Sequence, residues 1–346
     1  MSITNKFIAK NRLFVLGAGF SADAGVPLTG ELLSLTMKKF AAECPGLFER
    51  VNNYAEVCFR REGIVYSDIN FSDLCTFLEY VELREYAGGE RWSDTGSREK
   101  LALKFYVSKT IAQHTPRAES IPDIYVRFAE QLHEYDIVIS FNWDCLLEAV
   151  LDRLGKEYTY DFQGKGIKLC KLHGSINWRL GEPDKNRPKY SSNIRKWSPT
   201  GLADAVMQKD IYHSSCLKYF DGWKEVEPLG EAKPCIVLPG FGKAFDVRTL
   251  ATLWYKPEFA FGFTHNVYII GLSLTPDDFF VRSFFLDNLP FLKPHAAERR
   301  EIVIINSDAN TKDNYEFALA NPCAKFLNEK FQIKHVDQMA EQLKNP

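Results

Sequence analysis

Short apolar runs that end in glycine or a polar residue recur along the chain, and they predict buried strands. The first, Leu13 to Gly17, is too short for a helix and is followed by a turn. Bounded runs of this kind are typical of strands buried on both faces of a parallel sheet. Similar runs predict further strands over residues 136–140, 168–172, 235–238, 266–271 and 301–306.

Between several of these runs, apolar residues recur at helical spacing. This pattern predicts amphipathic helices over residues 30–40, 71–81, 101–107 and 145–154. Strands that alternate with helices favour an α/β fold built on a Rossmann-like, doubly wound parallel sheet.

The chain shows no internal repeat and no low-complexity tract, and we expect residues 1–346 to form a single domain. Segment 41–130 is mixed and mostly helical, so we interpret it as a helical insertion. Segment 180–234 is polar and rich in Lys, Pro and Ser, which favours a second insertion or a flap. Residues 330–346 are expected to form a last strand and a short helix.

Composition and charge narrow the classes of function. The net charge of −2 gives no electrostatic footprint for nucleic acid, and no stretch approaches the roughly 20 apolar residues of a membrane-spanning helix. The eight cysteines are scattered and none forms a C-x-x-C pair. We therefore expect reduced thiols, no zinc ribbon and no bound metal, in a cytoplasmic protein.

A glycine-rich loop, Gly17-Ala-Gly-Phe-Ser-Ala-Asp-Ala-Gly25, directly follows the first predicted strand. Glycines there allow a tight turn and let backbone N–H groups approach a diphosphate at a helix N-terminus. The third glycine comes six residues after the second, not three as in the dehydrogenase fingerprint. A plain strand-to-helix turn that needs positive φ is the alternative, so the loop alone only favours nucleotide binding.

Polar residues follow two more predicted strands. Ser140-Phe-Asn-Trp-Asp144 places Asn142 and Asp144 at a strand's carboxyl end, where ligands bind in open α/β sheets. A helix N-cap is the alternative role for either residue. Lys171-Leu-His-Gly-Ser175 places His173 in the same setting, and a histidine that titrates near neutral pH can accept a proton from water or a hydroxyl.

Taken in order, these motifs resemble the sirtuin family, and specifically its zinc-free bacterial branch, which is similar to NADase effectors of antiphage defence. The first loop with Gly25-Val-Pro27, the Asn142–Asp144 segment and His173-Gly174 carry the resemblance, together with Gly271-Leu-Ser273 and Ile304-Ile-Asn306. Protein-deacylating sirtuins have four zinc-binding cysteines after the His-Gly pair, whereas residues 174–240 contain only Cys216 and Cys235.

The resemblance implies roles for individual residues. Asn142 would orient the nicotinamide ribose or the attacking water, Asp144 would hold the nicotinamide amide, and His173 would accept a proton. The residues expected to contact the rest of NAD are Gly17, Ala18, Gly19, Phe20, Ser21, Gly25, Gly271, Ser273 and Asn306.

The function implied is NAD+ hydrolysis to nicotinamide and ADP-ribose, or to a cyclic product, with NAD+ as substrate and no metal. By the same resemblance we expect a homo-oligomer, or a sensor partner such as a ring-shaped ATPase, that gates the activity in antiphage defence. An NAD-dependent deacylase or ADP-ribosyltransferase is the alternative enzyme, with a peptide groove near Pro239–Gly242. A non-catalytic module that senses NAD or ADP-ribose is another alternative. A Rossmann oxidoreductase is disfavoured by the glycine spacing.

Overall fold

A computed structural model gives the fold of the chain. It describes residues 12–83, 98–160, 165–180, 189–190, 211–214, 234–240, 243, 250, 253–254, 260–261, 264, 266–288, 301–319 and 324–344.

A seven-stranded sheet forms the centre of the fold, and every strand pair in it is parallel. Its order is β11-β10-β9-β1-β2-β4-β3. The strands are β1 (Arg12–Leu16), β2 (Ile137–Ser140), β3 (Tyr158–Thr159), β4 (Ile167–Lys171), β9 (Asn266–Ile270), β10 (Glu301–Ile305) and β11 (Ala324–Leu327). This confirms the predicted α/β, Rossmann-like doubly wound sheet.

The strand order reverses at β1, and this reversal determines where a ligand can bind. The chain builds outward from β1 through β2 to β4, then returns to the other side of β1 and builds outward through β9, β10 and β11. The connections from β1 and from β9 therefore continue to opposite sides of β1 in the sheet, and ligands of open α/β sheets bind outside the strand ends at such a switch point.

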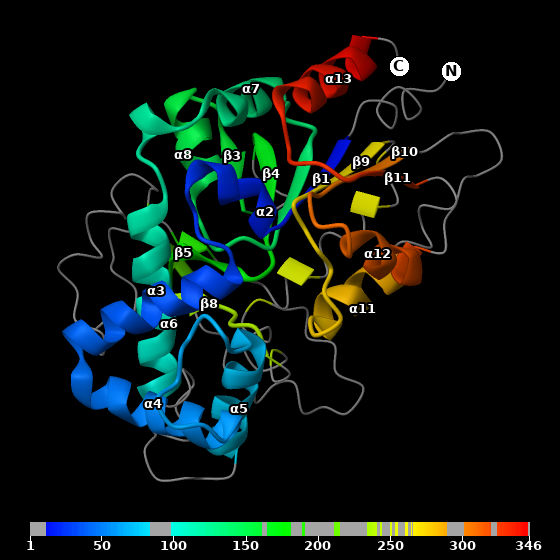
Figure 1. The fold of residues 1–346 in the computed structure, drawn as a ribbon. Coiled ribbons are helices and arrows are strands. Elements are labelled where there is room, and N and C mark those ends of the chain that lie inside the picture. The colour runs from blue at the N-terminus through cyan, green and yellow to red at the C-terminus, as the bar shows by residue number, and fades with distance from the viewer. Residues whose placement is uncertain are drawn as a thin grey trace, which may run out of the picture.

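Helices cover both faces of this sheet. In Figure 1, α7, α8 and α13 gather on the upper side of the sheet and α11 and α12 on the lower side. A further group, α3 to α6, lies between β1 and β2 in the sequence and packs together. The helices are α2 (Ala18–Ser21), α3 (Thr29–Glu43), α4 (Pro45–Phe59), α5 (Phe71–Leu83), α6 (Arg98–His114), α7 (Asp123–Gln131), α8 (Leu146–Arg153), α11 (Phe279–Asn288), α12 (Thr311–Leu319) and α13 (Ile333–Lys344).

Helix α6 is longer than the predicted 101–107 because polar residues extend it at both ends. It is surrounded by other elements, so even its lysines are buried. Lys109 pairs with Glu43 of α3 at 2.6 Å, and Lys100 pairs with Glu79 of α5 at 3.4 Å. Because these buried positions carry charged side chains, the sequence of α6 does not show the apolar face by which a packed helix is usually predicted.

A second, four-stranded antiparallel sheet was not predicted. Its order is β6-β7-β5-β8, with β5 (Gly174–Leu180), β6 (Lys189–Tyr190), β7 (Ile211–His213) and β8 (Pro234–Ile236). The run 235–238 does form a strand, but in this sheet, so its assignment to the parallel sheet was wrong. Most of the predicted flap, 180–234, lies outside the described residues.

The C-terminal strand was also misplaced. The prediction put a last strand and a helix within 330–346, whereas the strand is β11, at Ala324–Leu327, and only helix α13 falls in that range. β11 is an edge strand with half-buried or exposed residues, so it lacks the continuous apolar run that marks the central strands.

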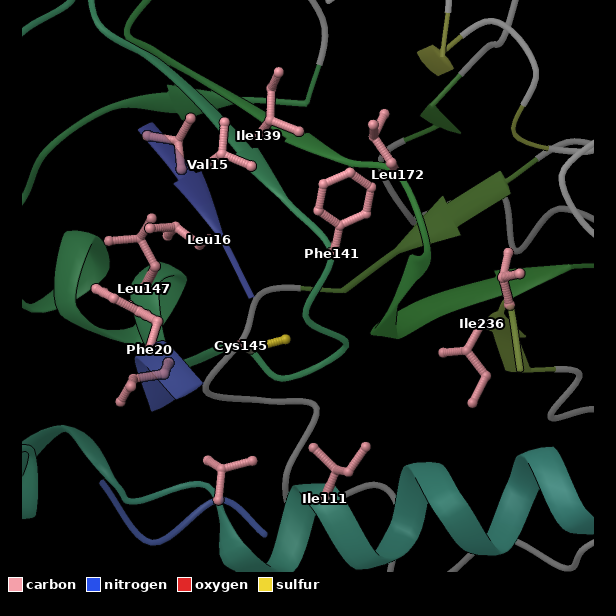
Figure 2. Close-up of a cluster of buried hydrophobic side chains, with 14 of the residues drawn as sticks. Val15, Leu16, Phe20, Ile111, Ile139, Phe141, Cys145, Leu147, Leu172 and Ile236 are labelled. Atoms are coloured by element: carbon pink, nitrogen blue, oxygen red, sulfur yellow. The ribbon is translucent and has the colours of Figure 1, made fainter. Parts of the chain in front are cut away.

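The hydrophobic core spans the parallel sheet and reaches the second sheet. Figure 2 shows Val15 and Ile139 from adjacent parallel strands near Phe141, with Ile236 of β8 and Ile111 of α6 further along the cluster. The same core thus supports the strand ends of both sheets. Within the described part of the chain, no helix has the length and apolar character needed to cross a bilayer.

Candidate functional site

A cavity of about 550 Å³ opens where the loops leave the carboxyl ends of β1, β2, β4, β9 and β10. Its size lies within the range of small-molecule sites. Nine of the twelve predicted site residues line it. They are Gly17, Ala18, Gly19, Asn142, Asp144, His173, Gly271, Ser273 and Asn306.

The other three predicted residues lie beside the cavity without lining it. The Phe20 ring is buried against Tyr125 and Phe331. The Ser21 hydroxyl is buried and accepts a hydrogen bond from Asn142 Nδ2 at 3.1 Å. Gly25 has φ of 89° and closes the short 3₁₀ turn that follows α2. These residues shape the wall behind the cavity.

The glycines after β1 and β9 are explained by a close approach of two backbones. A Cβ at Gly17 would lie 2.5 Å from Leu272 Cα, and one at Gly19 would lie 2.9 Å from Gly271 Cα. Gly271 itself has φ of 66°, and a Cβ there would overlap Phe20 N. Gly17 has φ of −116°, so the positive-φ turn suggested from sequence is not its reason.

This contact uses backbone donors that were expected to face a diphosphate. Gly19 N–H donates to Gly271 O at 2.9 Å, and Phe20 N–H donates to Gly17 O at 2.9 Å. The start of another helix lines the cavity instead. Thr29 and Gly30, which line it, form the first turn of the 15-residue helix α3, and no side chain caps that turn. The first N–H groups of a helix attract anions.

The Asn142–Asp144 turn connects β2 to α8 and is fixed at several atoms. Asn142 N–H donates to Ser140 Oγ at 3.2 Å, and Trp143 O accepts from Ile176 N–H at 3.0 Å. Asp144 Oδ1 accepts from Leu146 N–H, at the first residue of α8, at 3.0 Å. The N-cap position itself is Cys145, so Asp144 contacts the helix start from one residue before the cap. Both Asn142 and Asp144 remain in the cavity wall.

His173 occupies the corner where the chain passes from the parallel sheet to the antiparallel one. Its ring lies against Phe141, with centroids 5.1 Å apart, and near Trp254 at 6.0 Å. Gly174 has φ of 75°, and a Cβ there would overlap Cys235 O, so the sharp corner requires glycine. His173 O accepts from Val237 N–H at 2.9 Å. The corner therefore turns the imidazole into the cavity wall.

Burial controls the protonation of His173. Burial, followed by the charge of Lys243, lowers its pKa to about 3, although Asp278 and a backbone hydrogen bond with Phe141 oppose this shift. The imidazole is therefore neutral at pH 7, and its pKa is not the near-neutral one expected from sequence. Its Nε2 is buried and has no hydrogen-bond partner among the described residues.

Two charged residues near His173 were missed by sequence analysis. Lys243 Nζ and Asp278 Oδ2 form an ion pair at 2.7 Å, and both line the cavity. Burial acts to raise the pKa of Asp278, but the charges of Lys243 and His173 and the hydrogen bonds to the carboxylate together lower it on balance. Asp278 also accepts from Val281 N–H at the start of α11, a capping pattern that the sequence contains; Lys243 has no comparable signal.

The other end of the cavity is lined by Ser273 and Asn306. Asn306 Nδ2 donates to Ser273 Oγ at 3.3 Å. At the rim, Lys330 Nζ pairs with Asp23 Oδ1 at 2.9 Å, although the two residues are 307 positions apart in the chain. Hydroxyl and amide groups at this end can hydrogen-bond a sugar.

No group of three or more His, Cys, Asp or Glu side chains in the described ranges could hold a metal ion. Cys216, one of the two cysteines after the His-Gly pair, lies outside those ranges. The fold and the site thus define an α/β protein with a small-molecule cavity at the switch point of its sheet.

Comparisons with known proteins add a distant likeness to sirtuins. Sir2Tm bound to a propionylated peptide is 13% identical over 99% of this chain and 98% of its own, with a TM-score of 0.38. A Sir2–p53 peptide–NAD+ complex is 14% identical over 99% of this chain and 98% of its own, with a TM-score of 0.39. No family model and no curated protein matches the sequence. Values of this size identify neither a family nor an activity.

Proposed function

We propose that the protein is an NAD+ glycohydrolase, which cleaves the bond between nicotinamide and ribose to give nicotinamide and ADP-ribose. The observation that carries the proposal is the buried, unpartnered Nε2 of a neutral His173 in the cavity that Asn142 and the strand-end loops also line. A neutral imidazole nitrogen without a protein partner can accept a hydrogen bond from a bound water or hydroxyl.

The proposed placement of NAD+ follows the chemistry of the cavity wall. The adenosine ribose would lie at Ser273 and Asn306, whose amide and hydroxyl groups suit a sugar. The diphosphate would lie between Ala18 and the uncapped first turn of α3. The nicotinamide ribose would then reach Asn142 and His173.

Cleavage moves the electrons of the bond between the nicotinamide nitrogen and the ribose onto the departing nicotinamide. Positive charge develops on the ribose carbon, and the oxygen of a water molecule then bonds to that carbon. His173 Nε2 would orient this water and accept its proton, which finally passes to solvent. Because the pKa of His173 is about 3, the imidazole mainly orients the water through a hydrogen bond. It would accept the proton late in the step, when the bond between the water oxygen and the ribose carbon makes that water more acidic.

Asn142 and Asp144 would position the substrate. Asn142 Nδ2 is held by Ser21 Oγ, which leaves the amide oxygen of Asn142 for the ribose or the water. Only Oδ1 of Asp144 bonds Leu146 N–H, so its second oxygen can accept from the nicotinamide amide. A preorganised site of this kind needs little rearrangement as charge develops.

Nicotinamide release by the purified chain tests the proposal. Asn142→Ala and His173→Ala should each lower kcat by about 10²- to 10⁴-fold, the range typical for loss of general-base help or of a positioning contact. His133→Ala serves as the control, because His133 is exposed and does not line the cavity. Its kcat should equal that of the wild type.

The other outcomes separate the alternative functions. Release that requires an acyl-lysine peptide or a protein acceptor would establish a deacylase or an ADP-ribosyltransferase. NAD+ that binds and stays intact after long incubation, both with and without candidate partners, would establish a sensing module. Chromatography of the products distinguishes ADP-ribose from a cyclic product.

The resemblance in sequence also suggests that the NAD+ glycohydrolase activity is controlled by a gate. An enzyme that consumes NAD+ without control would be toxic, so oligomerisation or a sensor partner such as a ring-shaped ATPase would switch it on during antiphage defence. Light scattering of the purified chain measures the oligomeric state. Turnover that appears only with a candidate partner would support the gate.

A further inference from the structure

Two opposite charges lie fully buried directly behind the Asn142–Asp144 turn. Lys171, the last residue of β4, has 1% of its side chain exposed, and Glu148 of α8 has 2%. Lys171 Nζ and Glu148 Oε1 are 2.9 Å apart. Neither residue lines the cavity.

The ammonium group of Lys171 also holds the backbone of the turn. It donates a hydrogen bond to Asp144 O as well as to Glu148. The preceding carbonyl, Trp143 O, is fixed independently by Ile176 N–H of β5. The two carbonyls that follow Asn142 are therefore anchored to β4 and β5, the strands on either side of His173.

The same ion pair connects the turn to the second sheet. Tyr160 OH donates to Glu148 Oε1 at 3.3 Å and accepts from Asn177 Nδ2 of β5 at 3.0 Å. Asn177 Nδ2 also donates to Ser214 O, next to β7, at 3.2 Å. A buried hydrogen-bonded chain thus runs from β7 through the ion pair to Asp144.

Stability alone is a poor reason for such a pair. Desolvation of two buried charges largely cancels their attraction, and apolar residues of similar volume often stabilise a protein as well or better. Burial raises the pKa of Glu148. Burial also acts to lower the pKa of Lys171, but the charge and hydrogen bond of Glu148, together with the other nearby acidic groups, raise it on balance. What apolar residues could not supply is a donor directed at Asp144 O.

We propose that Lys171 and Glu148 are positioning residues, which hold the Asn142–Asp144 turn in its reactive geometry and tie it to the second sheet. This inference rests on the proposed NAD+ glycohydrolase function. A shift of about 1 Å in a reacting group can cost about 10²-fold in rate.

The test variant is Lys171→Met combined with Glu148→Gln. It removes both charges together, so no unpaired charge is left buried, and glutamine keeps an acceptor for Tyr160 OH. We expect the variant to fold and to bind AMP, which would occupy only the end at Ser273 and Asn306, with unchanged Kd. We expect it to release nicotinamide with kcat about 10- to 100-fold lower and KM unchanged.

The matched control is Arg12→Met combined with Asp136→Asn. This pair is equally buried, with 3% and 1% of its side chains exposed, and its nitrogen and oxygen are 2.5 Å apart. It lies at the amino ends of β1 and β2, opposite the cavity. We expect it to change the free energy of unfolding without changing kcat.

A second readout separates this inference from the proposed function. The chain contains six tryptophans, and Trp143 lies in the turn itself. In 5-fluorotryptophan-labelled protein, the ¹⁹F resonance lost in Trp143→Phe should shift in the Lys171/Glu148 variant and stay in place in the Arg12/Asp136 variant. A wild type without turnover, both alone and with the candidate partners, would refute the glycohydrolase, while this shift would still support the positioning role.

Two results would overturn the inference. One is a folded Lys171/Glu148 variant whose kcat equals that of the wild type. The other, which applies even without turnover, is a Trp143 resonance that does not move or that moves equally in the control. If the double variant does not fold, Lys171→Leu combined with Glu148→Gln, which also leaves no unpaired charge buried, is read by the same resonance against Arg12→Leu combined with Asp136→Asn.

Discussion

His173 shows how the surroundings of one residue set its chemistry. The sequence identifies a histidine at a strand end, and from composition alone it would titrate near neutral pH. In the structure, Phe141 and Trp254 enclose the ring, and burial lowers its pKa to about 3. The residue is therefore a neutral acceptor in every condition in which the protein is expected to work.

The lowered pKa predicts how stability depends on pH. In the unfolded chain His173 has a pKa of about 6.5, so the unfolded state binds a proton below that pH. The folded state binds this proton only at about pH 3. Stability therefore falls as pH drops through this window. Between pH 7 and pH 5, the free energy of unfolding of the wild type should fall by about 2 kcal/mol more than that of His173→Gln.

Urea unfolding at a series of pH values measures this difference. The comparison uses the slope against pH, because the substitution also changes stability by an amount that does not depend on pH. His133→Gln is the control, because His133 is exposed. Its replacement should not change the slope of the free energy of unfolding against pH. Identical slopes for His173→Gln and the wild type would show that the folded imidazole titrates normally.

Which site residues could be predicted depends on whether a short motif carries them. Asn142, Asp144 and His173 follow apolar runs directly, so the neighbouring residues are enough to predict that they lie at strand ends. Asp278 could have been found as a cap, but its pairing with Lys243 depends on tertiary contacts between segments 35 residues apart. No local pattern specifies such a pair.

Among the elements, the loops after β1 and β9 depend on each other. Gly17 and Gly19 approach Gly271 and Leu272 so closely that side chains cannot be placed between them, and Gly17 N–H donates to Ile270 O at 3.0 Å. The two loops form one surface at the switch point. A change in either loop should therefore disturb both sides of the cavity.

Gly271→Ala tests this dependence. Its φ of 66° is unfavourable for alanine, and its Cβ would overlap Gly19 and Phe20 backbone atoms. Strain and overpacking together should lower the free energy of unfolding by about 2–5 kcal/mol and weaken ADP-ribose binding.

Gly46→Ala is the matched control. Gly46 lies exposed in α4 with open space around it, so alanine should be neutral or stabilise by up to about 1 kcal/mol. Chemical unfolding and calorimetric titration measure both effects. Equal behaviour of the two variants would contradict the close approach of the loops.

The prediction of elements succeeded where a buried strand is a continuous apolar run and failed where polar residues interrupt the strand, as in the equally buried β5. β1, β9 and β10 are continuous apolar runs, and each was placed within about a residue of its bounds. β5 was missed because it follows His173 after a single turn and carries Ser175, Asn177 and Arg179 in its sequence. Whether a strand joins the parallel or the antiparallel sheet is decided by tertiary pairing.

For the molecule as a whole, the cavity is shared by the two halves of the sheet. One half contributes the loops after β1, β2 and β4, and the other contributes the loops after β9 and β10. The described contacts across the cavity rim include the single ion pair between Asp23 and Lys330, which is exposed and contributes little to stability. A ligand that spans the cavity would therefore add a connection between the halves.

This arrangement predicts different protection by a spanning and a short ligand. ADP-ribose would reach from Asn306 to Asn142, so it should slow amide hydrogen exchange at both 271–274 and 142–145. AMP would occupy only the end at Ser273 and Asn306 and should protect 271–274 alone. At 100 times its Kd, ADP-ribose should also stabilise the fold by about 2.7 kcal/mol. Equal protection of both segments by AMP would mean that the adenosine lies elsewhere, because a half-length ligand placed as proposed cannot contact the turn after β2.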